Sequence, residues 1–208
     1  MFETLSKYKV VPVVAVDSAE EGLRLCEALQ AGGLPVAEIT FRTRAAEATI
    51  REASKRFPEM ILGAGTVLTA DQMKRAKDAG AKFAVSPGCN PTTIRAAKEV
   101  GLSFAPGVCT PSDVERALEL GCRQMKFFPA EASGGVGMLK ALIGPYGHLG
   151  IRFCPTGGVK ASNMRDYLAL REVAFVGGTW IAKKDLVKAG DWAGISRLAS
   201  EAVALARD

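Results

Sequence analysis

Val10-Val11-Pro12-Val13-Val14-Ala15-Val16 is an unbroken apolar run near the start of the chain. A continuous run of this kind is typical of a strand that is buried on both faces, as in a parallel sheet. Ser18-Ala19-Glu20-Glu21 follows and has the pattern of a helix start with a capping box. Apolar residues then recur at helical spacing from Leu23 to Leu29, and Gly32 follows as a helix stop. This part of the chain therefore predicts a buried strand followed by a helix.

The same strand-then-helix pattern recurs along the chain. We count about eight such units, which is the number in a (β/α)8 barrel. The 208 residues are fewer than the roughly 250 typical of that fold, so we expect short loops. A doubly wound open sheet is the alternative, but it would require a Gly-rich turn where the chain has Val16-Asp17-Ser18. No linker or shift in composition divides the chain, so we expect residues 1–208 to form one α/β domain, a compact TIM barrel. The expected strands are 10–16, 35–41, 61–66, 82–86, 102–105, 124–128, 151–155 and 173–177.

The charge distribution bears on the class of partner. The formal net charge is +5, and the 27 basic residues are spread along the chain, with no run longer than Lys183-Lys184. A nucleic-acid-binding surface would require a concentrated basic patch, so this pattern argues against a nucleic-acid partner. A mild preference for anions favours small acidic metabolites instead.

The cysteines and the N-terminus bear on metal content and location. The five cysteines form no C-x-x-C pair, and His148 is the only histidine, which argues against a zinc site. Free thiols favour a reducing compartment. The chain shows no signal peptide and no apolar stretch of membrane-spanning length, so we expect a cytoplasmic protein without a membrane partner.

One cation interrupts a later apolar strand, Gln124-Met125-Lys126-Phe127-Phe128, which ends at Pro129. Strand alternation places Lys126 and Phe128 on one face. An ammonium among aromatic rings loses hydration, which favours the neutral amine, a nucleophile for carbonyl carbon. The alternative is that Lys126 extends from a strand end to water with its stem packed on Phe128. These residues alone leave both interpretations open.

A second strand carries a carboxylate and a guanidinium. Glu38, Thr40 and Arg42 share one face at period two. A structural Glu38–Arg42 ion pair is one interpretation. The other makes Glu38 a general base near Lys126 and Arg42 an anchor for an anion, since a guanidinium can grip a carboxylate with two hydrogen bonds.

Further polar or glycine-rich segments fall where other predicted strands end, namely Thr66, Ser86-Pro87-Gly88, Thr156-Gly157-Gly158 and Gly177-Gly178-Thr179. Barrel active sites lie at the C-terminal ends of the strands, and the loops after the last two strands commonly bind phosphate. A single Gly-Gly pair is an ordinary turn more often than not. Two such pairs, each beside a threonine, favour a phosphate site.

Taken together, these segments resemble the KDPG/KHG aldolase family, the aldolases of 2-keto-3-deoxy-6-phosphogluconate and 4-hydroxy-2-oxoglutarate. The resemblance runs nearly end to end, with the motifs in the same order, and their combination is far more specific than any one motif. The segments that carry it are Pro35 to Thr43, Gly63-Ala64-Gly65-Thr66-Val67-Leu68, Ser86-Pro87-Gly88, Lys126-Phe127-Phe128-Pro129-Ala130-Glu131 and Phe153-Cys154-Pro155-Thr156-Gly157-Gly158.

The resemblance implies a class I lyase that uses neither metal nor cofactor, on a TIM barrel that is usually a homotrimer. The implied substrate is a keto-acid phosphate of Entner–Doudoroff carbohydrate metabolism, cleaved to pyruvate and glyceraldehyde 3-phosphate, while the shorter substrate would give glyoxylate. By the same similarity Lys126 is the Schiff-base lysine and Glu38 handles protons. Arg42 and Thr66 match positions that hold the pyruvate carboxylate.

The other substrate-binding positions implied by the resemblance are Pro87, Phe128, Thr156, Gly157, Gly158, Gly178 and Thr179. The glycines and Thr179 match the phosphate-binding end, and Thr156 matches a position that contacts substrate hydroxyls. Many relatives carry serine where this chain has Thr179, and the extra methyl group would narrow a phosphate pocket.

Three other functions are weighed against this one. A phosphogalactonate-type aldolase would differ in hydroxyl stereochemistry, which the sequence does not reveal. A phosphate-binding barrel isomerase would share the glycine-rich site but would need no imine-forming lysine. A non-catalytic ligand-binding barrel would be expected to lack Glu38 or Lys126, and both are present.

Overall fold

A computed structural model describes residues 1–207, and within them the chain is an α/β fold built on parallel strands. Every strand pair in the two sheets is parallel. The six-stranded sheet has the order β5-β4-β3-β2-β1-β9, and the three-stranded sheet has the order β6-β7-β8. The strands are β1 (Val10–Val14), β2 (Val36–Thr40), β3 (Ile61–Gly65), β4 (Phe83–Val85), β5 (Ser103–Ala105), β6 (Gly107–Val108), β7 (Gln124–Phe127), β8 (Arg152–Phe153) and β9 (Val176–Gly178).

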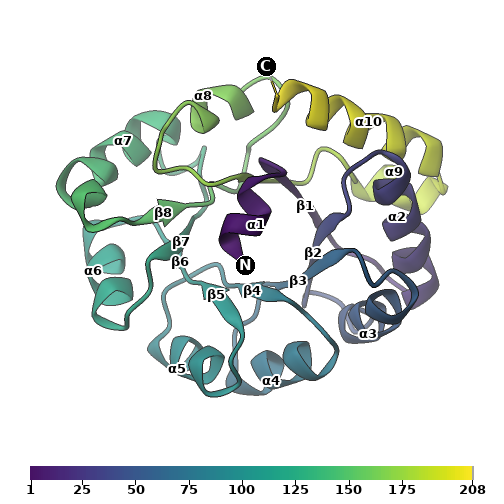
Figure 1. Cartoon of the computed structure of the whole chain (residues 1–208), viewed down its shortest axis with the longest axis horizontal. Helices are drawn as coiled ribbons and strands as arrows, with labels where there is room; N and C mark the ends of the chain where they lie inside the picture. The colour runs from purple at the N-terminus through teal and green to yellow at the C-terminus, as the bar shows by residue number, and fades with distance from the viewer. Residues whose placement is uncertain (208) are drawn as a thin grey trace.

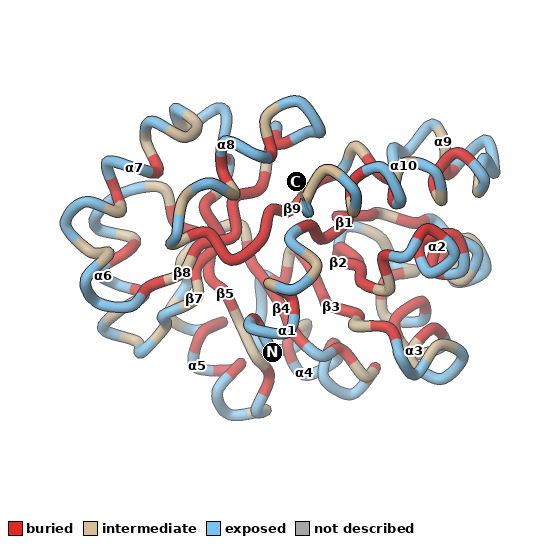
Figure 2. Tube along the Cα trace, turned by 45° about the horizontal axis from the view of Figure 1, so that its top comes forward, coloured by how far each residue is buried: buried red, intermediate tan, exposed pale blue. Residues whose placement is uncertain are grey.

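The strands curl around a common centre and most helices lie outside them (Figure 1). The strands form the most continuous buried part of the chain, whereas the outer helices alternate between buried and exposed residues (Figure 2). The helices are α1 (Phe2–Ser6), α2 (Ala19–Ala31), α3 (Ala46–Arg56), α4 (Ala70–Asp78), α5 (Pro91–Glu99), α6 (Pro111–Glu119), α7 (Gly135–Tyr146), the 3₁₀ helix η1 (Gly147–Leu149), α8 (Met164–Leu168), α9 (Lys184–Ala189) and α10 (Trp192–Leu205).

The two sheets approach each other at both edges. Pro106 alone separates β5 from β6, and its carbonyl accepts a hydrogen bond from the Lys126 backbone N–H at 2.8 Å. On the other side, an isolated bridge joins Thr156 to Gly177 beyond β8. The predicted α/β class with parallel strands is confirmed, and the observed sheet is a curled parallel half-barrel. The closed eight-stranded barrel stays a prediction.

Helix starts follow the sequence signals in most places. Ser18, Thr69 and Asn90 each accept a backbone hydrogen bond at the N-cap, and Thr110 forms a full capping box with Asp113. Such caps satisfy N–H groups that have no partner inside the helix.

Threonine is a common N-cap residue, so the sequence predicts a helix start at Thr43, and this prediction is wrong. Helix α3 begins at Ala46 after Ala45, which makes no side-chain cap. The Thr43 hydroxyl instead donates to the Val16 carbonyl at 2.7 Å. Its hydroxyl therefore binds the loop after β1 rather than the start of α3.

Two short helices were not predicted, because α1 and α9 are too short to display a clear apolar period. Helix α1 lies across the middle of the ring of strands in Figure 1. Phe2 stacks on Phe175 at 5.9 Å between ring centroids and meets the edge of Phe83 at 6.3 Å. Phe83 is the first residue of β4, so α1 covers the N-terminal ends of the strands. Among residues 1–207, no helix has the length and apolar character needed to cross a bilayer.

Candidate active site

A hollow of about 230 Å³ lies at the end of the fold where the strands finish. We call it the upper hollow. Its lining comes from most of the strands and from the loops that follow them, so it is the place where their C-terminal ends converge. It brings together every predicted site residue except Gly178. The lining residues are Val13, Glu38, Thr40, Arg42, Thr66, Pro87, Lys126, Phe128, Thr156, Gly157, Gly158, Val159, Gly177 and Thr179.

Lys126 and Glu38 form a buried ion pair in the upper hollow. The Lys126 Nζ lies 3.0 Å from Glu38 Oε1 and 3.4 Å from Oε2. Lys126 is 5% exposed and Glu38 is 4% exposed. Lys126 Nζ also lies 5.5 Å from the centroid of the Phe128 ring. The lysine therefore does not extend to solvent, and the interpretation of a strand-end lysine reaching water is wrong.

The curl of the strands explains how residues 88 positions apart, in two different sheets, can meet. Glu38 is in the middle of β2 and Lys126 is in β7, and each points to the interior of the curled sheet. Removing two charges from water is expensive, and a buried ion pair recovers this free energy only with good geometry. The pair is therefore weak evidence that these residues stabilise the fold, and stronger evidence that they have a catalytic role. At 3.0 Å a proton can pass directly between the amine and the carboxylate, which leaves a neutral amine.

Gly65, which we did not predict as a functional residue, makes room for the Glu38 carboxylate. A β-carbon added at Gly65 would overlap Glu38 Oε1. Gly65 ends β3 and pairs in register with Thr40, two residues beyond the pairing of Glu38 with Gly63. In the sequence, Gly63-Ala64-Gly65-Thr66 is consistent either with a close approach of the backbone to a ligand or with tight strand packing. The signal in the sequence for the role of Gly65 was a glycine in the strand that follows the one carrying Glu38.

Arg42 does not pair with Glu38, so the structural Glu38–Arg42 ion pair is wrong. Arg42 follows β2 and is exposed at the mouth of the upper hollow. Its Nε donates to the Thr40 hydroxyl at 3.2 Å. Thr66 lines the same hollow just after β3 and has a φ angle of 55°. A β-branched residue at positive φ is strained, and such strain is concentrated at functional sites.

The glycine-rich end of the upper hollow is formed by the loops after β8 and β9. Gly157 and Gly158 have φ angles of 99° and 81°, which favour glycine and leave the backbone open to a close approach. Thr179 lies beside them in the lining. Gly178 does not line the hollow, because its α-carbon faces the indole ring of Trp180, and Gly177 lines it instead.

Glu131 supports this glycine-rich loop. It accepts a hydrogen bond from the Tyr167 hydroxyl, and its backbone N–H donates to the Gly157 carbonyl at 2.9 Å. Its side chain also lies against Gly158, where a β-carbon would overlap it. Glu131 therefore holds the loop rather than lining the hollow.

Cys154 is packed next to the Lys126–Glu38 ion pair, and its thiol is unreactive at neutral pH. Burial raises the pKa of its thiol to about 12, with a smaller lowering by Lys126 and a smaller raising by Glu38. A thiol that stays protonated at neutral pH is a poor nucleophile. Cys154 is buried and fills space in the core.

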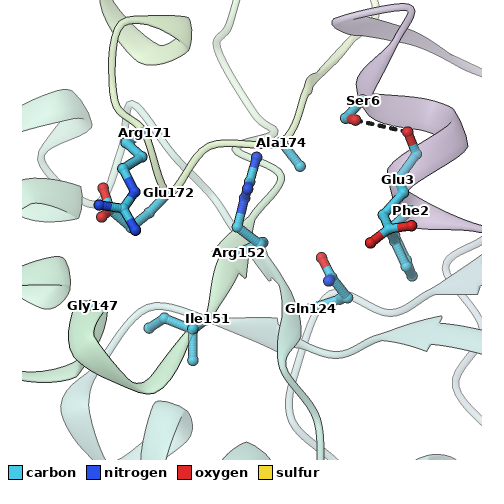
Figure 3. Close-up of a pocket in the computed structure, with 11 residues that line it drawn as sticks. Phe2, Glu3, Ser6, Gln124, Gly147, Ile151, Arg152, Arg171, Glu172 and Ala174 are labelled. Atoms are coloured by element: carbon cyan, nitrogen blue, oxygen red, sulfur yellow. Dashed lines mark hydrogen bonds between the residues drawn. The ribbon is translucent and has the colours of Figure 1, made fainter.

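A second hollow of about 300 Å³, the lower hollow, lies where the strands begin (Figure 3). Arg152 projects between α1 and the segment that carries Arg171 and Glu172 (Figure 3). The lower hollow contains neither Lys126 nor Glu38. Among residues 1–207, no three His, Cys, Asp or Glu side chains form a group that could hold a metal ion.

Comparisons with known proteins agree on one family. The profile of the KDPG and KHG aldolase family matches residues 1–198. The 2-dehydro-3-deoxy-phosphogluconate aldolase of Haemophilus influenzae is 46% identical over 203 residues, which cover 98% of this chain and 95% of that protein.

Solved structures show the same likeness in three dimensions. The KDPG aldolase of Legionella pneumophila, solved with pyruvate captured as a covalent carbinolamine intermediate, superposes with a TM-score of 0.91 at 38% identity, covering 96% of this chain and 97% of the other. The 2-keto-3-deoxy-6-phosphogluconate aldolase of Zymomonas mobilis, solved with 3-phosphoglycerate, gives 0.89 at 37% identity, covering 98% and 95%. The chain therefore belongs to the KDPG and KHG aldolase family.

Proposed function

We propose that the chain is a class I aldolase that cleaves 2-keto-3-deoxy-6-phosphogluconate to pyruvate and glyceraldehyde 3-phosphate, and also cleaves 4-hydroxy-2-oxoglutarate to pyruvate and glyoxylate. The observation that carries the proposal is the buried Lys126–Glu38 pair at 3.0 Å. It supports imine chemistry because it supplies an amine, a proton acceptor and a water-poor setting at one point. Membership of the family and the names of the relatives agree with this activity.

The first stage is formation of the imine. Glu38 takes a proton from the Lys126 ammonium, and the neutral amine attacks the C2 ketone of the substrate to give a carbinolamine. Proton transfer to the C2 oxygen, with Glu38 as the donor, releases water and leaves a protonated imine. The two Glu38 oxygens lie 3.0 and 3.4 Å from Nζ, so one carboxylate can serve both transfers.

The second stage is cleavage. Glu38 removes the proton from the C4 hydroxyl, the C3–C4 bond breaks, and its electrons move into the protonated imine to give an enamine. The aldehyde leaves with its new carbonyl at C4. The enamine takes a proton at C3, and water then releases pyruvate and restores the Lys126 amine. A general base contributes about 10²–10⁴-fold, so covalent catalysis and positioning supply most of the remaining acceleration.

The lining of the upper hollow supports a proposed place for each end of the substrate. Arg42 and Thr66 are proposed to hold the carboxylate, since they lie at the mouth on the β2 and β3 side. Gly157, Gly158 and Thr179 are proposed to hold the phosphate through backbone N–H groups and one hydroxyl. The remaining proposed contacts are made by Pro87, Phe128 and Thr156.

The test is cleavage of 2-keto-3-deoxy-6-phosphogluconate, followed by detection of pyruvate and glyceraldehyde 3-phosphate as separate products. Equal release of both supports the proposal. Isomerisation without cleavage would support a barrel isomerase, and binding without turnover would support a non-catalytic barrel. The C4 epimer of the substrate, assayed in parallel, separates a phosphogalactonate-type aldolase from this one.

The role of Glu38 has its own test. In Glu38→Gln the side chain keeps its shape but cannot accept a proton, so kcat should fall by about 10²–10⁴-fold. Lys126 should still form a pyruvate adduct that borohydride can trap. Unchanged kcat would remove Glu38 from the proton-transfer role.

We also propose that residues 1–208 form a single closed (β/α)8 domain that assembles as a cytoplasmic homotrimer. The Thr156–Gly177 bridge and the short Pro106 gap support closure, since they leave little open edge between the sheets. The free cysteines within residues 1–207 support a reducing compartment. Sedimentation velocity gives the subunit number directly, and a monomer would rule the trimer out.

A further inference from the structure

Arg42 has one edge of its guanidinium held by a neighbour. Its Nε donates to the Thr40 hydroxyl at 3.2 Å, and no carboxylate of residues 1–207 forms an ion pair with it. A guanidinium has five N–H donors, and the remaining four are on Nη1 and Nη2. The edge left for an incoming carboxylate is therefore the one formed by Nη1 and Nη2.

The Thr40 hydroxyl is itself fixed. Thr40 is the last residue of β2 and is 1% exposed. The hydroxyl donates to the Val14 carbonyl of β1 at 2.9 Å. Because a hydroxyl has a single proton, this bond directs its lone pairs toward Arg42 and rules out rotation to a different arrangement without losing the bond to β1. The chain Val14–Thr40–Arg42 thus connects an exposed, flexible side chain to the rigid sheet.

We propose that Thr40 is a positioning residue that orients Arg42 so that Nη1 and Nη2 face the substrate carboxylate, and that it thereby makes the site selective for 2-oxo acids over ketones without a carboxylate. This inference rests on the proposed function, in which Arg42 holds the carboxylate. Its physical basis is preorganisation, since a free arginine side chain loses more conformational freedom on binding than one held at Nε.

Thr40 also lines the upper hollow two residues from Glu38 on the same face of β2. One face of a single strand therefore carries the proton acceptor and the positioning group, followed by the carboxylate anchor. In every 2-oxo acid the carboxylate is bonded directly to the reacting C2 carbon, so a carboxylate anchor beside the proton acceptor suits this class of substrate. A ketone without the carboxylate would lose the Arg42 contact but keep the contact with Lys126.

The test compares Thr40→Val, which removes the hydroxyl at nearly constant shape, with Thr40→Ser, which keeps it. Thr43→Val is the matched control, because Thr43 makes a similar hydroxyl bond to the Val16 carbonyl but no bond to Arg42. The readouts are KM and kcat for cleavage, and the rates of borohydride trapping with pyruvate and with hydroxyacetone, a ketone without a carboxylate.

In Thr40→Val we expect KM for the keto acid to rise about tenfold, as for one lost hydrogen bond to a charged group, with kcat within about twofold. Trapping with pyruvate should slow, and trapping with hydroxyacetone should stay unchanged. Thr40→Ser and Thr43→Val should behave like the parent chain. If Thr40→Val does not fold, Thr40→Ala, which also lacks the hydroxyl, goes through the same assays.

Equal slowing with pyruvate and hydroxyacetone would overturn the proposal, because it would show a merely structural role for the hydroxyl. Arg42→Gln separates this failure from a failure of the proposed function. If Arg42→Gln raises KM while Thr40→Val does not, only the positioning role is lost. If Arg42→Gln leaves KM unchanged, Arg42 is not the anchor and both proposals fail at that residue.

Discussion

The two ends of the strand ring contain hollows of similar size that differ in how their charged side chains are buried and paired. The upper hollow, of about 230 Å³, holds one lysine and one glutamate that are almost completely buried and paired at 3.0 Å. The lower hollow, of about 300 Å³, holds Arg152, Arg171, Glu3 and Glu172, and none of them forms an ion pair within residues 1–207 (Figure 3).

The difference between the two hollows shows that charged side chains alone do not make a catalytic site. A catalytic site of this kind also requires a group that can become a nucleophile. An arginine stays protonated at any working pH and cannot become a nucleophile. A lysine in contact with a carboxylate in a water-poor setting can lose its proton to that carboxylate. The lower hollow has charge without a nucleophile, and exposed Arg171 and Glu3 keep their hydration. The comparison therefore predicts that substitutions at the two ends have very different consequences.

Replacement of a basic side chain by methionine should have its largest effect in the upper hollow. Lys126→Met should abolish turnover, because methionine cannot form an imine. It also leaves the Glu38 carboxylate buried without its partner, so the free energy of unfolding should fall by about 3–5 kcal/mol. Urea unfolding and a pyruvate-release assay measure both effects. The double variant Glu38→Gln/Lys126→Met should recover most of the lost stability but none of the activity, and a double variant as unstable as the single one would contradict the pairing argument.

Gly65→Ala should have the next largest effect. The added methyl group overlaps the Glu38 carboxylate, which must move away from Lys126. A displacement of this kind costs about 10²-fold in kcat when it disturbs reacting groups. Gly33→Ala is a poor control because of its positive φ, whereas Gly137→Ala on α7 has open space at the β-carbon. Gly137→Ala should keep full activity, and an equally active Gly65→Ala would show that Glu38 has room to spare.

The pH dependence of stability gives a smaller effect at the upper end. Burial raises the pKa of the Cys154 thiol from 9.0 to about 12. The folded chain therefore keeps a proton that the unfolded chain releases above pH 9. The stabilisation is complete below pH 9 and is lost as the pH rises through about 12, with a slope of up to about 1.4 kcal/mol per pH unit.

Urea unfolding between pH 8 and 10.5 checks this, with Cys154→Ala losing stability less steeply than the parent chain. Cys26→Ala is the matched control away from the ion pair, since burial also raises the pKa of the Cys26 thiol to about 12. Both variants should show the same shallower slope. Curves that run parallel to the parent would mean that these thiols are not protonated in the folded state at pH 10.

Arg152→Met, in the lower hollow, should have the smallest effect. The Arg152 Nε is buried and makes no hydrogen bond within residues 1–207. Removing it relieves a desolvation penalty of about 1–3 kcal/mol, while the methionine retains most of the packing of the arginine stem. We expect kcat within about twofold of the parent and a free energy of unfolding that is unchanged or higher. A large loss of kcat would show that the two hollows are coupled.

The sequence predicted the upper end better than the lower end, for physical reasons. A cation in the apolar strand around Lys126 is costly enough to be conspicuous in one dimension. Glu38 was conspicuous for the same reason, but its partner was ambiguous, because Arg42 is close in sequence and Lys126 is close only after the sheet curls. The resemblance to a family resolved what local pattern left open.

Other features had no clear signature in the sequence. Helix α1 has only five residues, so its apolar face shows no period, and the lower hollow that it borders was not anticipated. The role of Thr40 depends on a hydroxyl between β1 and Arg42, and threonine is common in strands for other reasons. Gly178 was predicted to bind phosphate, but only the folded backbone shows that Trp180 lies over it.

The most direct measurement is the intact mass of the chain after borohydride reduction in the presence of pyruvate, followed by peptide mapping. We expect one reduced pyruvate per chain, attached to the peptide that contains Lys126, and no adduct in Lys126→Ala. An adduct on another lysine, or an unmodified chain under conditions where pyruvate is bound, would contradict the central claim that the buried amine is the nucleophile.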